Sequence, residues 1–300
     1  MGDLEADYQA LHDGVGAFWV DRDAVSVAGP AAISFLQGQC SQDVAGLADG
    51  QCAWTLVLQP RGKVEVLCRA TRVGDEEVVL DTDAGWGAAL VARLNRFKLR
   101  TKAEIAPVSW RCLALRGPGV DGLALDQPGD DSLWRMADAG WPGWPAIDLL
   151  GTDPPPPPDG VPLVSAAAFE LARIEAGVPR MGRELTQDSI PAETGLVDRT
   201  VSFTKGCYTG QELVARIDSR GGHVPRHLRL VLLDQPAPVG ASVIVEGKAA
   251  GVLTSVAPTP AGGAVALAYL GRDVTPPTAV AISWDAGSTD GRAESLPPAP

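Results

Sequence analysis

The stretch KGCYTGQE, residues 205–212, places a single thiol between a cation and two glycines. Gly206 and Gly210 permit tight turns and a close backbone approach, so a ligand can reach the sulfur of Cys207. Lys205 would lower the pKa of that thiol if the loop turned the ammonium toward the sulfur. The stretch therefore predicts a reactive or soft-ligand cysteine. The alternative stays open that Cys207 is a small buried hydrophobe, as most free cysteines are.

Length and composition indicate a globular protein of two or three domains, since the chain has 300 residues. It is 45% hydrophobic with a net charge of -12. An acidic chain lacks the basic surface that broad nucleic-acid binding needs, although a local basic groove remains compatible with an acidic body. Nucleic-acid binding is therefore not expected.

The amino-terminal residues MGDLEADYQALHD lack the basic start and apolar core of a secretory signal. No apolar run approaches the roughly 18 to 20 residues of a membrane span. The five cysteines form no CxxC pair and the three histidines are scattered, so neither a disulfide framework nor a preformed metal site is expected. A cytoplasmic protein without membrane contact is predicted.

The pattern of the first two thirds mixes strands and helices. Residues 53–58 and 64–70 predict a hairpin that turns through QPRGK, and the proline run at 153–160 predicts a stiff connector.

Two longer helices are predicted in the same region. Asp83 can cap a helix whose apolar stripe starts at Trp86 and leaves Arg93 outside, and Ser165 can cap a helix that ends at Gly177.

After Pro225 five short apolar or alternating segments follow one another, separated by glycine or proline: HLRLVLL, ASVIV, GVLTSVA, AVALAYL and AVAISW. They predict a small antiparallel barrel. Residues 285–300 are polar and rich in glycine and proline, which predicts a frayed tail. The fold class is therefore α+β with an all-β C-terminal domain.

The motif KGCYTGQE followed by LVAR resembles the signature of the YgfZ family, the folate-binding proteins that assist iron–sulfur enzymes. Further pieces similar to that family occur in the expected order: AGPAAISFLQGQCSQDV at 28–44, RGKV at 61–64, ARIEAGVPRMGREL at 172–185 and IPAETGLVD at 190–198. The similarity spans about residues 20–225.

The resemblance implies the three-domain, ring-like fold shared with the aminomethyltransferase of the glycine cleavage system. Tetrahydrofolate or a derivative would lie in a central channel lined by the cysteine motif. The implied domains are an interleaved folate-binding region at 1–110 and 160–222, part of a central α+β domain at 111–159, a barrel at 223–290 and a disordered tail at 291–300.

The candidate site residues follow from the motif and the resemblance. Cys207 and Lys205 are the candidate catalytic residues, and the candidate folate-binding residues are Gly206, Tyr208, Gln211, Glu212, Arg216, Phe169, Glu193 and Arg61. Phe169 would pack against the folate or belong to a helix core. Glu193 would accept from pterin N–H groups or cap the following segment. Arg61 and Arg216 are solvated cations or bind a polyglutamate tail.

Two departures from the aminomethyltransferase pattern bear on activity. Val66 and Leu67 stand where that enzyme carries an acidic doublet, and Trp144 stands where it carries a pterin-binding glutamate. Glu65 is the acid nearest to the position of the missing doublet. It is either a functional substitute for the doublet or a solvated strand residue. Aminomethyl transfer by the known mechanism is not expected.

Three functional hypotheses result. The first is a tetrahydrofolate-binding protein that supports assembly or repair of iron–sulfur clusters, with client or assembly proteins as partners. The second is a folate-dependent one-carbon transferase or demethylase, and the third is a scaffold with a structural cysteine. Some members of the resembling family are connected with tRNA modification, but the basic stretch at 220–229 is interpreted here as a domain linker.

Overall fold

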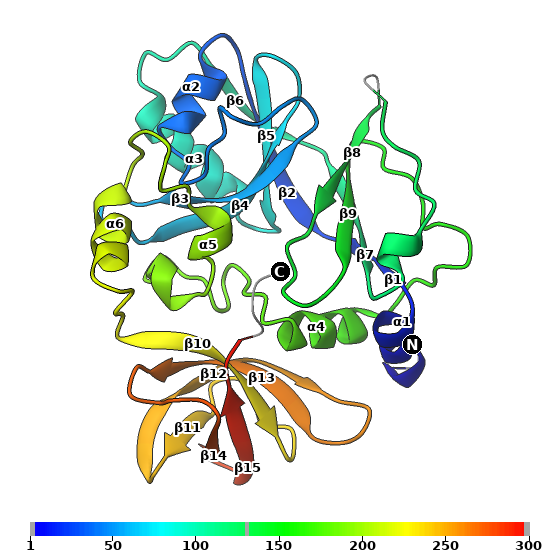
Figure 1. Ribbon diagram of the computed structural model, residues 1–300, viewed down its shortest axis with the longest axis vertical. Helices are drawn as coiled ribbons and strands as arrows, with labels where there is room; N and C mark the ends of the chain where they lie inside the picture. The colour runs from blue at the N-terminus through cyan, green and yellow to red at the C-terminus, as the bar shows by residue number, and fades with distance from the viewer. Residues whose placement is uncertain (1–3, 130–131, 297–300) are drawn as a thin grey trace.

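The described residues, 4–129 and 132–296 of a computed structural model, form two antiparallel sheets and a closed barrel. Figure 1 shows the two sheets side by side, with the barrel beneath them and helix α4 (Ala166–Glu175) between the barrel and the second sheet. None of the helices in this part of the chain combines the length and apolar composition needed to cross a membrane.

The first sheet has five strands and carries two helices on one face. The predicted hairpin is confirmed as β3 and β4, with Thr55 opposite Cys68. Helices α2 (Ala32–Gln37) and α3 (Gly87–Lys98) bury their apolar side chains against the sheet in one core. In spatial order the strands are β3 (Cys52–Leu58), β4 (Val64–Arg72), β5 (Glu77–Asp83), β2 (Arg22–Ala28) and β6 (Glu104–Val108).

Helix α3 does not begin at the predicted cap. Asp83 ends β5, and its carboxylate accepts a hydrogen bond from Met181 N at 2.9 Å. Asp23 accepts instead from Gly85 N at 2.9 Å and from Gly87 N at 2.7 Å. The cap was predicted wrongly because the pairing of β2 with β5 brings a carboxylate to the helix from a distant part of the chain.

Arg93 also differs from its prediction, since it is 5% exposed. Its guanidinium donates to Leu58 O at 2.8 and 3.2 Å and lies 3.8 Å from the Phe97 ring centroid. Its long side chain carries the charge through the apolar face to a carbonyl, a path that residue spacing does not show.

The second sheet has four strands, with α1 (Leu4–Asp13) and α4 packed beside it. Ser165 caps α4 as predicted, accepting from Ala168 N at 3.4 Å, and Gly177 follows the helix with a φ of 66°. A short 3-10 helix, η1 (Val120–Gly122), follows β7. In spatial order the strands are β1 (Gly16–Val20), β7 (Arg111–Arg116), β9 (Ala146–Gly151) and β8 (Trp134–Asp138).

The C-terminal barrel is confirmed and has six strands. Its spatial order is β10 (Arg226–Leu233), β13 (Ala264–Gly271), β12 (Lys248–Pro258), β11 (Ser242–Val245), β14 (Thr278–Trp284) and β15 (Gly287–Glu294).

Strand β15 lies where a frayed tail was predicted, so that prediction was wrong for Gly287–Glu294. Thr289 and Ala293 face the barrel interior, and a Cβ at Gly291 would lie 2.4 Å from Leu232 O. Small inward residues satisfy a narrow barrel although the segment is polar overall. Residues 297–300 of the predicted tail lie outside the described residues.

Three short helices connect the first sheet to the barrel (Figure 1): η2 (Pro191–Glu193), α5 (Val197–Thr200) and α6 (Gln211–Ser219). Residues 220–225 link α6 to β10, whereas 226–229 of the predicted linker form the start of β10.

Candidate functional site

The KGCYTGQE loop is held against the first sheet by its lysine. Lys205 Nζ donates to the carbonyls of Gln37, Cys40 and Gln42 at 2.6, 2.7 and 2.9 Å. An ammonium has three protons, so all of them are used. Burial lowers the pKa of Lys205, although the nearby Cys40 and Asp43 partly oppose this. The arrangement assigns Lys205 to anchoring the loop on the end of α2, and gives no support to its activating Cys207.

Cys207 is exposed, whereas Cys40, Cys68 and Cys112 are buried and Cys52 is half-buried. Desolvation raises the pKa of the Cys40 thiol to about 11 and that of the Cys112 thiol to about 12. The buried thiols are therefore protonated at neutral pH. The accessible thiol that the motif predicted is the one at position 207.

The RGK turn that contains Gly62 packs against the KGCYTGQE loop at Gly210. Gly62 and Gly210 have φ values of 79° and 85°, and a Cβ added at Gly62 would lie 2.4 Å from Leu213 Cβ and 2.9 Å from Gly210 O. A Cβ at Gly210 would lie 2.6 Å from Gln59 O. The RGK turn and the cysteine motif, which are far apart in the sequence, thus form one close backbone contact that needs glycine on both sides.

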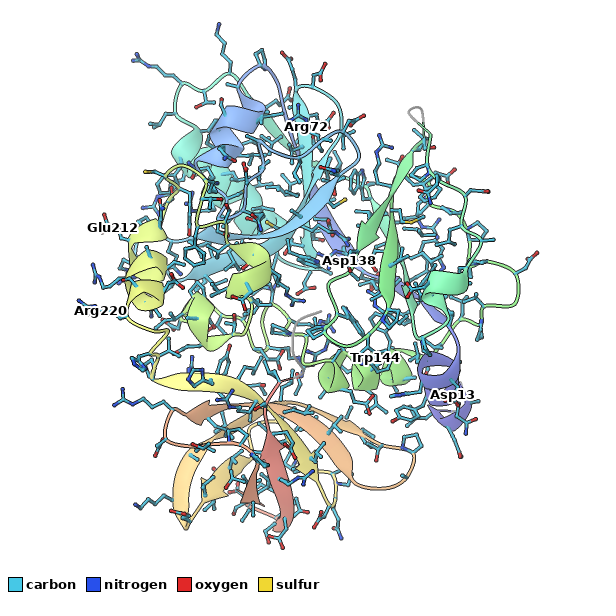
Figure 2. The ribbon with its side chains drawn as sticks, in the orientation of Figure 1. Asp13, Arg72, Asp138, Trp144, Glu212 and Arg220 are labelled. Atoms are coloured by element: carbon cyan, nitrogen blue, oxygen red, sulfur yellow. The ribbon has the colours of Figure 1, made fainter. Side chains whose placement is uncertain are left out.

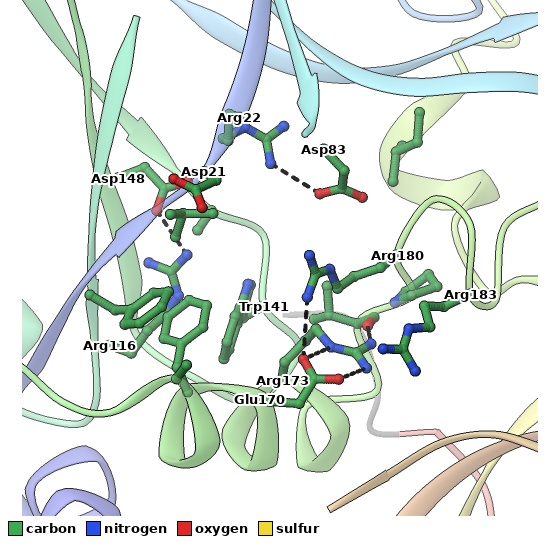
Figure 3. A pocket seen from close by; sticks show the side chains of 18 of the residues that line it. Asp21, Arg22, Asp83, Arg116, Trp141, Asp148, Glu170, Arg173, Arg180 and Arg183 are labelled. Atoms are coloured by element: carbon green, nitrogen blue, oxygen red, sulfur yellow. Dashed lines mark hydrogen bonds and ion pairs between the residues drawn. The ribbon is translucent and has the colours of Figure 1, made fainter. Parts of the chain in front are cut away.

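A central cavity of about 460 Å³ lies where the two sheets, α4 and the barrel meet. Figure 3 shows arginine and carboxylate side chains facing into it above α4. The lining is Phe18, Val20, Asp21, Arg22, Trp54, Leu67, Asp83, Arg116, Ala139, Trp141, Asp148, Ala166, Phe169, Glu170, Arg173, Val178, Pro179, Arg180, Arg183, Arg199 and Val256.

One wall of the central cavity is aromatic. The rings of Phe18 and Phe169 stack with centroids 4.6 Å apart, and Trp141 lies 5.2 Å from Phe169. The Arg116 guanidinium lies 4.5 Å from the Trp141 centroid. This wall offers flat apolar surface with an adjoining cation, which suits a planar aromatic ligand.

Two buried donors in the lining have no hydrogen-bond partner among the described residues: Trp54 Nε1 and Arg116 Nε. An unmet buried donor costs about 1–3 kcal/mol. A ligand that brings acceptor atoms to these donors would remove that cost.

The mouth of the cavity is cationic. Arg173 forms an ion pair with Glu170 at 2.7 Å, and Arg180 reaches the same carboxylate at 3.5 Å (Figure 3). Arg180 is 47% exposed, and Arg183 forms no ion pair with any described residue. Both guanidinium groups are therefore available to a ligand carboxylate.

A buried chain of charges crosses from the first sheet to the second. Asp81 pairs with Arg22 and Arg69, Arg69 continues to Asp148 at 2.7 Å, and Asp148 pairs with Arg116 at 2.8 Å. Burial raises the pKa of both aspartates, but their arginines outweigh it, lowering the pKa of Asp81 and bringing that of Asp148 to about 2. Asp148 therefore stays ionised at neutral pH and is no general base.

Among the predicted folate residues, Phe169 lines the central cavity, where it also packs against Phe18. The resemblance implied that the cysteine motif lines the channel, but the cavity lining contains no residue of 205–212. Tyr208 is instead buried in the core beneath α6, and Gln211 Oε1 accepts from Tyr208 N at 3.3 Å.

The remaining predicted residues also lie away from the cavity. Glu193 accepts from Ile190 N at 3.4 Å, at the start of its own helix η2 and not in the following segment as predicted, and pairs with Arg226 at 3.1 Å. Arg61 and Arg216 are exposed.

Val66, Leu67 and Trp144 stand where the aminomethyltransferase pattern carries acids, and the structure shows where they lie. Leu67 lines the cavity and Val66 is buried, so the strand supplies apolar surface there. Trp144 packs edge-on against Trp141 and His12. Glu65 accepts from Gln187 outside the cavity. Figure 2 shows Glu212 and Arg220 on the outer side of α6.

Sequence reasoning missed Trp54, Arg116, Arg180, Arg183 and Asp21. Arg116 ends the apolar strand CLALR, where a buried cation is unusual, and this was the one available signal. Within the described residues, no group of three or more His, Cys, Asp or Glu side chains is arranged to hold a metal ion.

Comparisons with known proteins agree with this architecture. Residues 2–125 match the family model described as the GCVT N-terminal domain. An "Iron-sulfur cluster assembly factor IBA57 homolog, mitochondrial" from Neurospora crassa is 27% identical over 221 residues, covering 67% of this chain and 49% of that protein. The "tRNA-modifying protein YgfZ" of Pectobacterium carotovorum is 26% identical over 224 residues, covering 68% of this chain and 66% of that protein. The chain thus spans about half to two thirds of these relatives.

The crystal structure of the glycine cleavage system aminomethyltransferase T from Bartonella henselae superposes with a TM-score of 0.82 at 22% identity, covering 98% of this chain and 89% of that one. The aminomethyltransferase-like fold that the resemblance implied is confirmed.

Proposed function

We propose that this chain, which is similar to YgfZ, IBA57 and aminomethyltransferase proteins, binds tetrahydrofolate or a derivative and supports the assembly or repair of iron–sulfur clusters in client proteins. The observation that carries folate binding is the central cavity, which combines an aromatic wall, two unmet donors and a cationic mouth. The client role rests on the names of the relatives.

The residues of the cavity fit a folate. Phe18, Phe169 and Trp141 would flank the flat pterin, while Trp54 Nε1 and Arg116 Nε would donate to its acceptor atoms. A volume of about 460 Å³ lies within the usual range for small-molecule sites. Asp21, an exposed carboxylate in the lining, would accept from pterin N–H groups.

The cationic mouth would hold the glutamate tail. Arg180 and Arg183 carry guanidinium groups available for carboxylates. When bound, the folate would supply the capacity to carry a one-carbon unit. The chain's own part is to bind and orient it and to exclude water from the aromatic wall.

Cys207 would act at the surface, toward a client. Its thiolate can ligate iron of a client's cluster transiently, with the cluster as substrate, because a thiolate is a favoured iron ligand. Exposure of this thiol and anchoring of its loop by Lys205 support that role.

One-carbon transfer by this chain is less well supported. Asp148 is held as an anion by Arg116 and Arg69, and Asp83 is engaged by Met181 N and Arg22. An amine substrate would need a free base at the cavity. Asp21 is the lining carboxylate without a hydrogen bond among the described residues, and the proposed folate position already uses it to accept from the pterin.

Two measurements test the proposal separately. Tetrahydrofolate titrated by calorimetry should bind the wild type, and Phe169→Ala should weaken binding about tenfold, since ring stacking is worth about 1–1.5 kcal/mol. Phe203→Ala, which removes an exposed ring outside the cavity, is the matched control. Absence of binding by the wild type overturns the folate part.

The client role is tested in cells depleted of the native protein. Cys207→Ser should bind folate normally and fail to restore the activity of iron–sulfur enzymes, while Cys52→Ser, at a half-buried thiol, should restore it. Full restoration by Cys207→Ser would overturn the role given to the thiol.

A further inference from the structure

A second cavity of about 310 Å³ adjoins the central one. Its lining is Cys52, Ala53, Trp54, Arg69, Asp138, Gly140, Asp198 and Arg199, so Trp54 and Arg199 belong to both linings. Figure 2 shows Asp138 near the middle of the molecule, between the two sheets. The folate proposal uses neither this space nor Arg199.

Two hydrogen-bond donors of the second cavity lie beside Gly140. A Cβ built on Gly140 would lie 3.2 Å from Trp54 Nε1 and 3.4 Å from Arg199 Nη1. Gly140 has a φ of 64° and carries no side chain. A side chain at this position would cover both nitrogens, whereas glycine leaves them uncovered.

Both donors are underused. Trp54 Nε1 is buried without a hydrogen-bond partner. Arg199 donates to Gly140 O, and no carboxylate among the described residues lies within ion-pair distance of its guanidinium. Burial lowers the pKa of Arg199 to about 10, although Asp138 at longer range partly opposes this. A half-buried cation without a close counter-ion favours an anionic ligand.

The other charges of the lining limit the class of anion. Arg69 is neutralised by Asp81 and Asp148. Desolvation raises the pKa of the Cys52 thiol, so it adds no negative charge at neutral pH. Asp138 and Asp198 are exposed carboxylates of the lining and repel multiply charged anions.

We propose that the second cavity is a binding subsite for a small monocarboxylate, whose oxygens accept from Trp54 Nε1 and the Arg199 guanidinium beside Gly140. The subsite shares the Trp54 indole N–H with the folate position given above, so the small acid and the pterin would compete for that one donor. A small acid bound there would contact Trp54 and Arg199, which line both cavities.

The test is an acetate titration of the full chain without folate, followed by the indole N–H resonance of Trp54 in nitrogen-15 NMR spectra. Trp54→Phe identifies that resonance by its loss. Acetate should shift it saturably at constant ionic strength, and sulfate should act much more weakly. A resonance that does not respond to acetate, or that responds equally to sulfate, overturns the proposal.

Matched variants locate the subsite. Arg199→Gln should weaken acetate binding at least about tenfold, since the lost contact is a hydrogen bond to a charged group. Gly140→Ala should abolish binding, because its methyl group would lie against both donor nitrogens and cover them. Gly143→Ala introduces the same left-handed alanine into open space, with a φ of 71°, and should bind like the wild type.

Thermal unfolding monitored by circular dichroism confirms that each variant is folded. Unchanged acetate affinity in folded Arg199→Gln or folded Gly140→Ala overturns the proposal.

Discussion

At the scale of single residues, the structure separates the two neighbours that the motif places together. The thiol of Cys207 faces solvent, while the ammonium of Lys205 is turned back onto three carbonyls of the first sheet's helix–loop segment. The motif therefore combines an accessible reactive atom with an anchor. A spacing of two residues favoured contact between them, but the carbonyls at the end of α2 compete for the same protons.

Lys205→Met should lower the free energy of unfolding by about 2 kcal/mol, because it removes hydrogen bonds from a charged group to buried carbonyls. Denaturant unfolding measures this, with Lys63→Met as control, since Lys63 pairs with the exposed Asp188. The rate of Cys207 alkylation by iodoacetamide in the folded variant should change little. A large fall in that rate would show that Lys205 activates the thiol after all.

The replacement Arg180→Gln/Arg183→Gln should weaken folate binding about tenfold, and more for a triglutamate than for a monoglutamate, because each lost guanidinium removes a charge-assisted contact. Calorimetric titration of both folates measures the difference. Arg61→Gln/Arg216→Gln removes two exposed cations that lie outside the cavity lining and should leave both affinities unchanged. If Arg61→Gln/Arg216→Gln instead weakened folate binding more than Arg180→Gln/Arg183→Gln, the glutamate tail would bind at the loop cations that were named from the sequence.

At the scale of elements, two glycine turns are the structural basis of the motif. The turn between β3 and β4 packs against Gly210 and against Leu213 in the first turn of α6, and neither glycine has room for a Cβ. The hairpin was predictable from apolar alternation and turn residues. Its contact with a loop about 150 residues away was not, because it depends on how the chain returns to the sheet.

Gly62→Ala should destabilise the protein by at least about 2 kcal/mol, since it adds steric overlap to the cost of a left-handed alanine. Gly74→Ala is a control at a similar φ of 85° with open space around the added methyl group, and should cost about 1 kcal/mol. Chemical denaturation of both variants gives the comparison. Equal losses would mean that the contact with Leu213 relaxes freely.

At the scale of the whole molecule, charge pairs run between the two sheets and from α4 toward the barrel, beside a hydrophobic cluster in which Leu171 and Ile174 of α4 pack against barrel residues. Arg69 on the first sheet reaches Asp148 on the second, and Arg173 on α4 reaches Glu184 and Ser255, the latter on the barrel. The central cavity lies among these connections, so its polar lining also holds the molecule together.

Asp148→Asn should lower the free energy of unfolding by about 3 kcal/mol at neutral pH, because it leaves two buried arginines with less counter-charge. The pKa of Asp148 is lowered on folding to about 2. Its contribution is therefore present above the unfolded value near 3.9 and is lost as the pH falls from about 4 to about 2.

Urea unfolding between those pH values should consequently show a steeper loss of stability for the wild type than for Asp148→Asn. Asp126→Asn, at an exposed carboxylate, is the control and should follow the wild type. Parallel pH profiles for wild type and Asp148→Asn would contradict the depressed pKa.

The sequence by itself determined the α+β class, the hairpin, the cap of α4, the C-terminal barrel and the accessible thiol, because each follows from local periodicity, turn chemistry or a short motif. The polar strand β15 was not predicted, because its small inward-facing residues form a strand only when β10 and β14 pair with it on either side. Tertiary structure alone decided the cavities. Trp54, Arg116, Arg180 and Arg199 come from separate elements, and their donors converge only after the sheets, α4 and the barrel have packed.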